Sequence, residues 1–596
     1  MNILLTAINA KYIHSNLAVY SLRACAGEYR DAVELAEYTI NNQKDYILEE
    51  LYKRKPDVLC FSCYIWNIDY VTDIAREYKK LCPSVPIWVG GPEVSYEVEA
   101  FLRENPYIDG VMIGEGEDTF RELCGYYAHK RKLNDIAGIA FRKKSADGKA
   151  GEIVFTSPRP IKNMSEIPFC YDTLDDFSNR IIYYESSRGC PFSCSYCLSS
   201  VDKTLRFRDT EIVKRELKFF IDQKVPQIKF VDRTFNCNHA HAMELWRFIK
   251  ANDNGVTNFH FEISADLLNQ EELELISDMR PGLIQLEIGV QSTNEVTIKE
   301  IHRTMKLERL KEVVRLIQSG NNIHEHLDLI AGLPYEDYDS FGRSFDEIYE
   351  LKPNQLQLGF LKVLKGSYMF EHAAEYGIVY HDKPPYEVMS TKWLSFDDVI
   401  KIKRVEDMLE VYYNSGQFEI TMKLMECIFD SAFEFFQELG DFYEANGYFG
   451  MSHSRIRRCE ILLEFLALYL HGCDSDAITS VGLSENDGDR DNTDFDENAQ
   501  IYSMIQESLI FDLYYRENCK SRPRWATDIG SFKHMTHAYC KNGKLSHVEP
   551  FHYIFPDKHT RKLDELPKYH KEPVWALFHY DMRDPLDHQA LVEYVE

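Results

Sequence analysis

The N-terminal part of the chain alternates short apolar runs with segments whose apolar residues recur every three to four positions. The runs are NILLTA, AVELAEY, DVLCFSCYI, VPIWVGG and GVMIGEGE, and patterns such as DYVTDIAREYKKL lie between them. Strands that are apolar throughout are typical of parallel sheets covered by helices on both faces. Residues 1–135 are therefore predicted to form a Rossmann-like α/β domain, in which a ligand lies beyond the carboxyl ends of the strands.

Residues 136–180 lack this alternation and are predicted to be a connector with a small hairpin, GIAFRK and EIVFTS. The alternation resumes with IIYYESS, QIKFVD, FHFEIS, LIQLEIG, HEHLDLIAG and LQLGFLKV. Six strand–helix units in residues 181–395 predict a (β/α)6 partial barrel, with its chemistry at the C-terminal ends of the strands. Long amphipathic patterns such as RIRRCEILLEFLALYLHG predict a mostly helical C-terminal domain in residues 396–596, which we expect to cap the substrate site.

The composition is that of a globular protein with more than one core, because 44% of the 596 residues are hydrophobic and 28% are charged. The net charge of −28 disfavours nucleic acid as a partner. No apolar run approaches the roughly 20 residues that cross a bilayer. The N-terminus MNILLTAINA has the pattern of a first strand and not of a signal peptide. The sequence therefore predicts a cytoplasmic protein without a membrane contact.

The fifteen cysteines are scattered, apart from Cys190, Cys194 and Cys197 in CPFSCSYC, just after the first predicted barrel strand. A zinc site requires four ligands, usually as two separated pairs. The pair Cys60 and Cys63 falls inside a strand pattern and is predicted to pack in the core. Three thiolates on one short loop instead suit a [4Fe–4S] cluster whose fourth iron remains open.

The segment CPFSCSYC resembles the Cys-x3-Cys-x2-Cys signature of radical S-adenosylmethionine (SAM) enzymes, with the aromatic Tyr196 before the third cysteine. This resemblance implies that the open iron chelates the amino and carboxylate groups of SAM. It also implies that electron transfer then cleaves the sulfonium to a 5′-deoxyadenosyl radical. The expected cofactors are therefore a [4Fe–4S] cluster and SAM.

Further residues at predicted strand ends match positions that such enzymes use for SAM. By resemblance, Asp232 in KFVDRTFN holds the SAM amine, and Glu262 in FHFEIS accepts a hydrogen bond from the ribose. Glu287 and Gln291 in LEIGVQS are expected against the nucleoside, and LIAGLPYED is expected to form a wall for adenine. Arg303 in IHRTM is expected to pair with the SAM carboxylate, which a guanidinium can grip with two hydrogen bonds.

A Rossmann-like domain ahead of such a barrel resembles the cobalamin-binding subclass, which implies cobalamin as a third cofactor. Its nucleotide tail is expected near Gly90 and Gly91 in VGGPEVS, where glycines let the backbone approach closely. The motif Asp-x-His-x-x-Gly, which supplies the lower cobalt ligand in other cobalamin proteins, does not occur. His14 in KYIHSN is either a ligand or a hydrogen-bonding residue of the same crevice. Tyr64 and Trp66 in CYIWN either form a floor beneath the corrin or pack in the domain.

The resemblance implies an enzyme that methylates an unactivated carbon of a small molecule or peptide, with flavodoxin or ferredoxin as electron donor. Radical ring closure or rearrangement, radical RNA methylthiolation and a non-catalytic cobalamin or redox sensor remain as alternatives. Methylthiolation predicts a second cysteine trio and a basic module, and neither is evident in the sequence. A sensor has no need of the SAM contacts expected for Asp232 and Arg303. The C-terminal region resembles an extension, without a settled function, in a subgroup of cobalamin radical SAM proteins.

Overall fold

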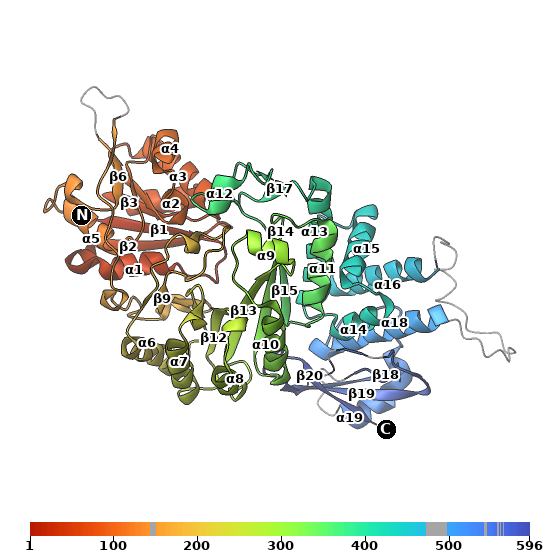
Figure 1. Ribbon diagram of the computed structural model, residues 1–596. Helices are drawn as coiled ribbons and strands as arrows, with labels where there is room; N and C mark the ends of the chain where they lie inside the picture. Colours follow the sequence, from red (N-terminus) through yellow and green to blue (C-terminus); the bar gives the residue numbers. More distant parts are fainter. Residues whose placement is uncertain are drawn as a thin grey trace.

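The computed structural model describes residues 1–143, 151–471, 497–540, 545–556, 560, 562–563 and 565–595. Three parts follow one another across the molecule (Figure 1): an N-terminal α/β domain, a central barrel and a C-terminal domain at the opposite end. None of the described helices combines the length and the apolar composition that a membrane crossing requires.

The N-terminal sheet has the strand order β2-β1-β3-β4-β5-β6-β7. Its parallel strands are β1 (Ile3–Asn9), β2 (Val33–Thr39), β3 (Val58–Ser62), β4 (Ile87–Gly90) and β5 (Gly110–Met112). These are the five strands of the predicted Rossmann-like unit. The predicted hairpin, β6 (Ile139–Arg142) and β7 (Ile153–Phe155), pairs antiparallel with β5 and so extends this sheet.

Helices cover both faces of the N-terminal sheet. They are α1 (Leu17–Cys25), α2 (Lys44–Arg54), α3 (Ile68–Leu81), α4 (Val98–Glu104) and α5 (Glu117–Tyr127). Alternate residues of β1 enter different cores: Leu4 packs with the core of α2 and α3, whereas Leu5 packs with that of α1 and α5. The second of these cores is continuous with the core of the barrel, so the two domains share one packed interior.

The central domain is an open, six-stranded parallel sheet in which the strands follow in sequence order. They are β8 (Ile182–Tyr184), β11 (Gln227–Phe230), β12 (Asn258–Ile263), β13 (Ile284–Gln291), β14 (His324–Ala331) and β15 (Gln355–Phe360). The outer helices are α6 (Thr210–Asp222), α7 (His239–Ala251), α8 (Gln270–Ser277), α10 (Leu307–Ser319) and α11 (Tyr338–Tyr349). The predicted partial barrel is confirmed. The buried face of α6 carries Val213, Leu217 and Phe220.

The C-terminal region is mostly helical, as predicted, but it ends in a sheet that the sequence did not indicate. Its main helices are α13 (Phe396–Leu409), α14 (Glu419–Ile428), α15 (Ala432–Ala445), α16 (Arg455–His471), α18 (Glu497–Arg516) and α19 (Lys533–Tyr539). An antiparallel sheet follows, with β18 (Ser546–Tyr553), β19 (Tyr569–Arg583) and β20 (Ala590–Val595). One face of this sheet packs on α18, where Phe511 contacts Phe551 and Phe578.

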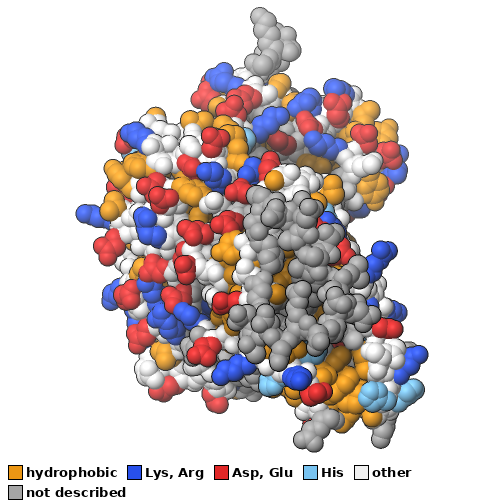
Figure 2. All heavy atoms as spheres, turned by 90° about the vertical axis from the view of Figure 1, so that its right-hand side faces the viewer, with side chains coloured by type: hydrophobic (Ala, Val, Ile, Leu, Met, Phe, Trp, Pro, Cys, Tyr) orange, Lys and Arg blue, Asp and Glu red, His pale blue; other side chains and the backbone are white. Residues whose placement is uncertain are grey.

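The surface of this end of the molecule carries charges of both signs. Figure 2 shows acidic and basic side chains interspersed over the face, with hydrophobic side chains gathered at its lower edge. Among the exposed hydrophobic residues of the terminal sheet and its loops are Ile554, Leu591 and Tyr594. Among the described side chains of this face, no continuous basic band of the kind that binds a polyanion is visible.

A buried carboxyl group joins two helices of the C-terminal domain. Asp512 of α18 accepts hydrogen bonds from the backbone N–H groups of Ile420 (3.0 Å) and Thr421 (2.9 Å), at the start of α14. Burial raises the pKa of Asp512 to about 7, despite these bonds, from an ordinary value of 3.8. At pH values between these two pKa values, Asp512 is protonated in the folded protein but ionised in the unfolded chain.

We therefore expect Asp512 to make the domain less stable as the pH rises from about 4 to 7, with no further change above pH 7. Titration of Asp512 lowers the free energy of unfolding by at most about 1.4 kcal/mol per pH unit. Asp512→Asn removes the titrating group, so the stability of this variant should change less with pH between about 4 and 7. Thermal unfolding of both proteins across this range checks the prediction, with Asp528→Asn, an exposed helix-cap aspartate, as the control. Parallel profiles for wild type and Asp512→Asn would contradict it.

Candidate active site

The three cysteines lie on one loop that follows the first barrel strand. Gly189, just before Cys190, has a φ of +88°, and a Cβ there would lie 2.6 Å from the carbonyl oxygen of Thr204. The turn that leads into the loop therefore requires glycine. Cys190 and Cys194 are buried, and Cys197 is half-buried.

Backbone hydrogen bonds from two distant segments fix this loop. The N–H of Ser195 donates to the carbonyl of Ile301 (2.9 Å), which follows α9 (Glu295–Glu300). The N–H of Met369, in α12 (Tyr368–His372), donates to the carbonyl of Ser195 (2.9 Å). The positions of the cysteines are thus set by the barrel and not by the loop alone.

The donor set fits an iron–sulfur cluster. Within the described ranges, no three His, Cys, Asp or Glu side chains converge on a single metal ion. A structural zinc site requires such convergence at about 2.3 Å from each sulfur. Each cysteine of a cubane cluster binds a different iron, so three thiols spread along one loop can hold it and leave one iron open. Cys60 and Cys63 have no exposed surface, which confirms their predicted place in the core.

Arg303 joins the cysteine loop to the fourth barrel strand. Its Nη1 donates to the Tyr196 hydroxyl (3.2 Å) and lies 3.8 Å from the Cys194 sulfur. Its Nη2 donates to the carbonyl of Gly289 in β13. The buried Nε has no hydrogen-bond partner. The guanidinium therefore stands beside the cysteine sulfurs with one donor unused, while its contact with the SAM carboxylate stays a prediction.

Arg303→Lys should raise the KM for SAM by about tenfold to a hundredfold, because an ammonium cannot reproduce the planar, two-donor grip. Iron content should be unchanged, since lysine keeps the positive charge near the sulfurs. Both are measured on the anaerobically reconstituted protein, with 5′-deoxyadenosine formation as the assay. Arg247→Lys on the outer face of α7, where the arginine is exposed and pairs with Glu271, is the matched control. An unchanged KM would contradict a role of Arg303 in holding SAM.

Asp232 follows β11 and has no exposed surface. One carboxylate oxygen accepts from the backbone N–H of Ser186 (2.9 Å), and the other from the hydroxyls of Ser186 (2.7 Å) and Ser187 (2.5 Å). Burial raises its pKa to about 6, although these hydrogen bonds favour the ionised form. Because the two serines lead directly to Cys190, the observed contacts of Asp232 support the cysteine loop. The contact of Asp232 with the SAM amine stays a prediction. In such a contact the amine would donate to a carboxylate oxygen that already accepts a hydrogen bond from Ser186 or Ser187.

Two other predicted SAM residues lie on β12 and β13: Glu262 near the end of β12, and Glu287 in the middle of β13. Glu262 and Glu287 are partners in register on these strands. Burial raises the pKa of Glu262 to about 7. Burial also acts to raise the pKa of Glu287, but His260 (3.0 Å) and Lys229 (2.8 Å) outweigh it and lower the value to about 2. Their nucleoside contacts stay predictions.

Gln291 ends β13 in an irregular conformation. The register between β13 and β14 shifts at this point, and Gln291 has a φ of +76°. Its side-chain carbonyl oxygen is buried without a hydrogen-bond partner. Buried acceptors are rarely left unpaired, so this oxygen fits a hydrogen bond from a bound ligand.

A cavity of about 770 Å³ lies between the N-terminal domain and the first barrel strands. All residues predicted to contact cobalamin line this one cavity: His14, Tyr64, Trp66, Gly90 and Gly91. The barrel contributes Tyr183, Glu185, Arg188 and Arg233. The crevice beyond the carboxyl ends of the N-terminal strands therefore faces the first strands of the barrel.

The aromatic and histidine residues of the cavity have defined partners. The rings of Tyr64 and Trp66 stack at 4.4 Å with an interplanar angle of 7°, and Trp66 remains 42% exposed. The Nδ1 of His14 lies 2.6 Å from the Tyr183 hydroxyl. Burial lowers the pKa of His14 and so favours the neutral ring. The geometry gives His14 a hydrogen-bonding role, and its role as a cobalt ligand stays a prediction.

Two glycines beside the cavity are required for different reasons. Gly91 has a φ of +122°, and a Cβ there would lie 2.4 Å from the carbonyl oxygen of Cys63, so the VGGPEVS loop packs closely on the end of β3. Gly114, after β5, has a φ of +73°, and a Cβ there would meet no atom within 4 Å. The bare backbone at Gly114 lines the cavity and fits the nucleotide tail of cobalamin.

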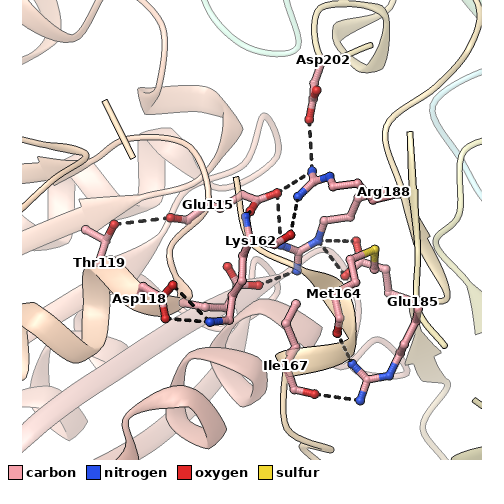
Figure 3. A network of polar contacts seen from close by, with 12 residues as sticks. Glu115, Asp118, Thr119, Lys162, Met164, Ile167, Glu185, Arg188 and Asp202 are labelled. Atoms are coloured by element: carbon pink, nitrogen blue, oxygen red, sulfur yellow. Dashed lines mark hydrogen bonds and ion pairs between the residues drawn. The ribbon is translucent and has the colours of Figure 1, made fainter. Parts of the chain in front are cut away.

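Sequence reasoning missed an ion-pair network in the wall of this cavity (Figure 3). Arg188, two residues before the first cysteine, contacts Glu185 (2.9 Å), Glu117 (2.5 Å) and Glu115 (3.5 Å). Arg206 also pairs with Glu115 (2.6 Å). The network joins the IGEGE loop after β5 to the backbone that enters the cysteine loop. In the sequence, the network is visible only as charged residues that follow predicted strands, and this does not show which of them pair.

A segment that follows the last barrel strand contacts both halves of the site. The Tyr386 hydroxyl donates to Glu93 in the VGGPEVS loop. Val388, in β17 (Val388–Ser390), fills the space beside Gly332 at the end of β14, where a Cβ would lie 2.6 Å from its Cγ1. One short segment therefore contacts the loop expected at the cobalamin tail and the loop expected at adenine.

Comparisons with known proteins match this geometry in three consecutive parts. The B12 binding domain family matches residues 3–124, the radical SAM superfamily residues 184–348, and the family described as protein of unknown function DUF4080 residues 374–589. The cobalamin-dependent radical SAM methyltransferase TokK of Streptomyces tokunonensis is 27% identical over 350 residues, or 55% of this chain. The chain spans about half of that relative, 49% of its length.

Two solved structures share the fold. The radical SAM methyltransferase TsrM of Kitasatospora setae, with cobalamin and a [4Fe–4S] cluster bound, has a TM-score of 0.52 at 17% identity. That match covers 65% of this chain and 82% of TsrM. OxsB, with aqua-cobalamin and SAM bound, has a TM-score of 0.53 at 15% identity, with 86% of this chain and 79% of OxsB covered.

The chain thus combines a B12 binding domain with a radical SAM domain, in the fold that cobalamin-dependent radical SAM proteins share. It carries the DUF4080 region as its C-terminal part.

Proposed function

We propose that the protein is a methyltransferase that uses a [4Fe–4S] cluster, SAM and cobalamin to methylate an unactivated carbon. One observation carries the proposal: the cysteine loop and the cavity expected to hold cobalamin share a wall. Ser187, Arg188 and Gly189 line the cavity and lead directly into Cys190. A radical formed at the cluster would therefore arise next to a bound corrin, and proximity of the reacting groups is the main contribution that a protein makes to such chemistry.

When bound, the cluster supplies the electron that cleaves SAM and cobalamin supplies the methyl group. The chain holds the cluster through Cys190, Cys194 and Cys197. Arg303 keeps a positive charge and an unused donor beside these sulfurs. On the cavity side, the Tyr64–Trp66 stack offers a flat apolar wall for the corrin face, and Gly90 and Gly91 line the cavity where the tail is expected.

An external electron donor such as flavodoxin or ferredoxin is part of this proposal, because SAM cleavage consumes an electron. Half-burial of Cys197 supports a route for that electron from the surface. The cytoplasm is the proposed location, and it is supported by the free state of every cysteine that the structure describes. The proposed substrate is a small molecule or a peptide, and nucleic acid is not expected.

The experiment is turnover of the anaerobically reconstituted, cobalamin-loaded protein with SAM carrying a deuterated methyl group. We expect 5′-deoxyadenosine, S-adenosylhomocysteine and transfer of the deuterated methyl group to the protein-bound cobalamin. Formation of 5′-deoxyadenosine without methyl transfer to cobalamin would favour ring closure or rearrangement. Absence of both products would contradict an enzymatic role and favour a sensor.

A further inference from the structure

The inner face of the barrel sheet is polar on at least five of its strands. Successive residues of a strand point to opposite faces of a sheet. On the helix-covered face the side chains are apolar and fully buried, as at Phe261, Leu286 and Leu327. Their neighbours on the opposite face are Tyr183, Lys229, His260, Glu287, His326 and Asp328.

These polar groups form an acid–base chain across neighbouring strands. The Lys229 ammonium lies 2.8 Å from the Glu287 carboxylate, and the His260 Nε2 lies 3.0 Å from the same carboxylate. One strand further, the His326 Nε2 lies 3.1 Å from Asp328 Oδ1. Desolvation acts to lower the pKa of His326, but Asp328 outweighs it, so the pKa is raised. The strand register connects the pairs, because Glu287 is the partner of His326.

The polar face adjoins the cavity expected to hold cobalamin at one residue, Tyr183. Tyr183 is the register partner of Lys229 on the same face of the sheet, and it also lines the cavity. Its hydroxyl is the group that contacts His14 across the domain boundary. A molecule bound on the inner face would therefore have one end beside the corrin and the other on the acid–base chain.

Barrel interiors are usually filled by branched apolar side chains. Charged groups placed there lose solvation energy unless they meet partners, water or a polar ligand. The side chains of Lys229, Glu287 and Asp328 are 24%, 21% and 21% exposed, so this face is open and not sealed. An apolar substrate that covered it would strip water from these charges without replacing the lost hydrogen bonds.

We propose that the substrate is a water-soluble small molecule, rich in hydrogen-bonding groups, whose non-reacting part binds Lys229, His260, His326 and Asp328. Glu287, which is expected against the SAM nucleoside, holds Lys229 and His260 in place. This inference rests on the proposed function, since it names the substrate class of the same site. It excludes lipids and other apolar substrates, for which the inner face offers no matching surface.

The test uses stimulation of 5′-deoxyadenosine formation by metabolites. Cells that naturally express the chain are extracted, and the extract is divided into an aqueous small-molecule phase, an organic phase and a protein pellet. Each is added to the reduced, cobalamin-loaded protein with SAM. We expect the aqueous phase to raise 5′-deoxyadenosine formation severalfold. Stimulation by the organic phase, by the pellet or by none of the three would overturn the proposal.

Variants localise the effect. In Lys229→Met and in the more conservative Asp328→Asn, the stimulated rate should fall towards the unstimulated rate of the same variant. Lys218→Met, on the outer face of α6 where the lysine is 46% exposed, should respond like wild type. A full response in both inner-face variants would also overturn the proposal. Absence of 5′-deoxyadenosine in every sample would instead defeat the proposed function, and this inference with it, so the two failures are distinguishable.

Discussion

Cys194→Ala is expected to reduce 5′-deoxyadenosine formation to the background rate. The loop offers three thiols to three irons, and the loss of one leaves a cubane cluster with too few protein ligands. Iron and sulfide per chain should fall together with the iron–sulfur absorbance. Cys190→Ala and Cys197→Ala should behave in the same way, because the three residues act as one unit.

The matched control is Cys427→Ala. Cys427 is an exposed thiol of α14 in the C-terminal domain, far along the chain from the cysteine loop. This variant should keep its iron content and its rate of SAM cleavage. Retention of the full iron–sulfur spectrum in Cys194→Ala would contradict the assignment of the cluster.

Arg188→Met is expected to destabilise the folded protein by about 3–5 kcal/mol, the usual cost of removing one partner from a buried ion pair. Arg188 is 18% exposed and Glu117 is 6% exposed, so solvent screens the pair little. The change leaves Glu115, Glu117 and Glu185 as neighbouring carboxylates without their shared cation. Repulsion among them should displace the IGEGE loop from the wall of the cavity, and the fraction of chains that retain cobalamin should fall.

Thermal unfolding and the corrin absorbance per chain measure the two effects of Arg188→Met. Arg121→Met is the control, because Arg121 pairs with Glu28 at the surface and is 52% exposed, so its loss should cost less than about 1 kcal/mol. Adding Glu117→Gln to Arg188→Met should restore part of the stability by removing one of the unpaired charges. Equal stability and equal cobalamin content in Arg188→Met and wild type would contradict a role of this network at the cavity.

The fold of the N-terminal domain was accessible from the sequence because parallel strands buried on both faces leave continuous apolar runs, and such runs marked β1 to β5. The six barrel strands were marked instead by apolar residues at every second position, as in QIKF and IQLEIG. The hairpin of β6 and β7 was also recognised, but not its place at the edge of the N-terminal sheet. Which edge a hairpin joins depends on pairing between distant residues, and no local pattern contains it.

The C-terminal sheet was missed for a related reason. Strand β19 contains an apolar run, but its ends are charged, and its partners lie across segments of irregular composition. The preceding helices from α13 to α18 suggested that the helical pattern would continue. The strands of an antiparallel sheet with one face on a helix and the other in solvent alternate apolar and polar residues. This pattern is harder to recognise in a sequence than the continuous apolar run of a buried parallel strand.

At the site, spacing identified the residues that act within one loop or at one strand end. The cysteine trio is the clearest case, and the contact between Arg303 and Tyr196 joins two residues that were named separately. The pairing of Arg188 with Glu115 and Glu117 could not be found in this way, because it forms between two domains. The hydrogen bonds from Ser186 and Ser187 to Asp232 were likewise hidden, since any serine near a strand end has the same local pattern.

Electron paramagnetic resonance of the reduced protein, with and without SAM, tests the central claim most directly. If Cys190, Cys194 and Cys197 hold a cluster with one open iron, the spectrum should be that of a reduced [4Fe–4S] centre. It should also change when SAM binds that iron. A reduced protein without a cluster signal, or with a signal that saturating SAM leaves unchanged, would contradict the account.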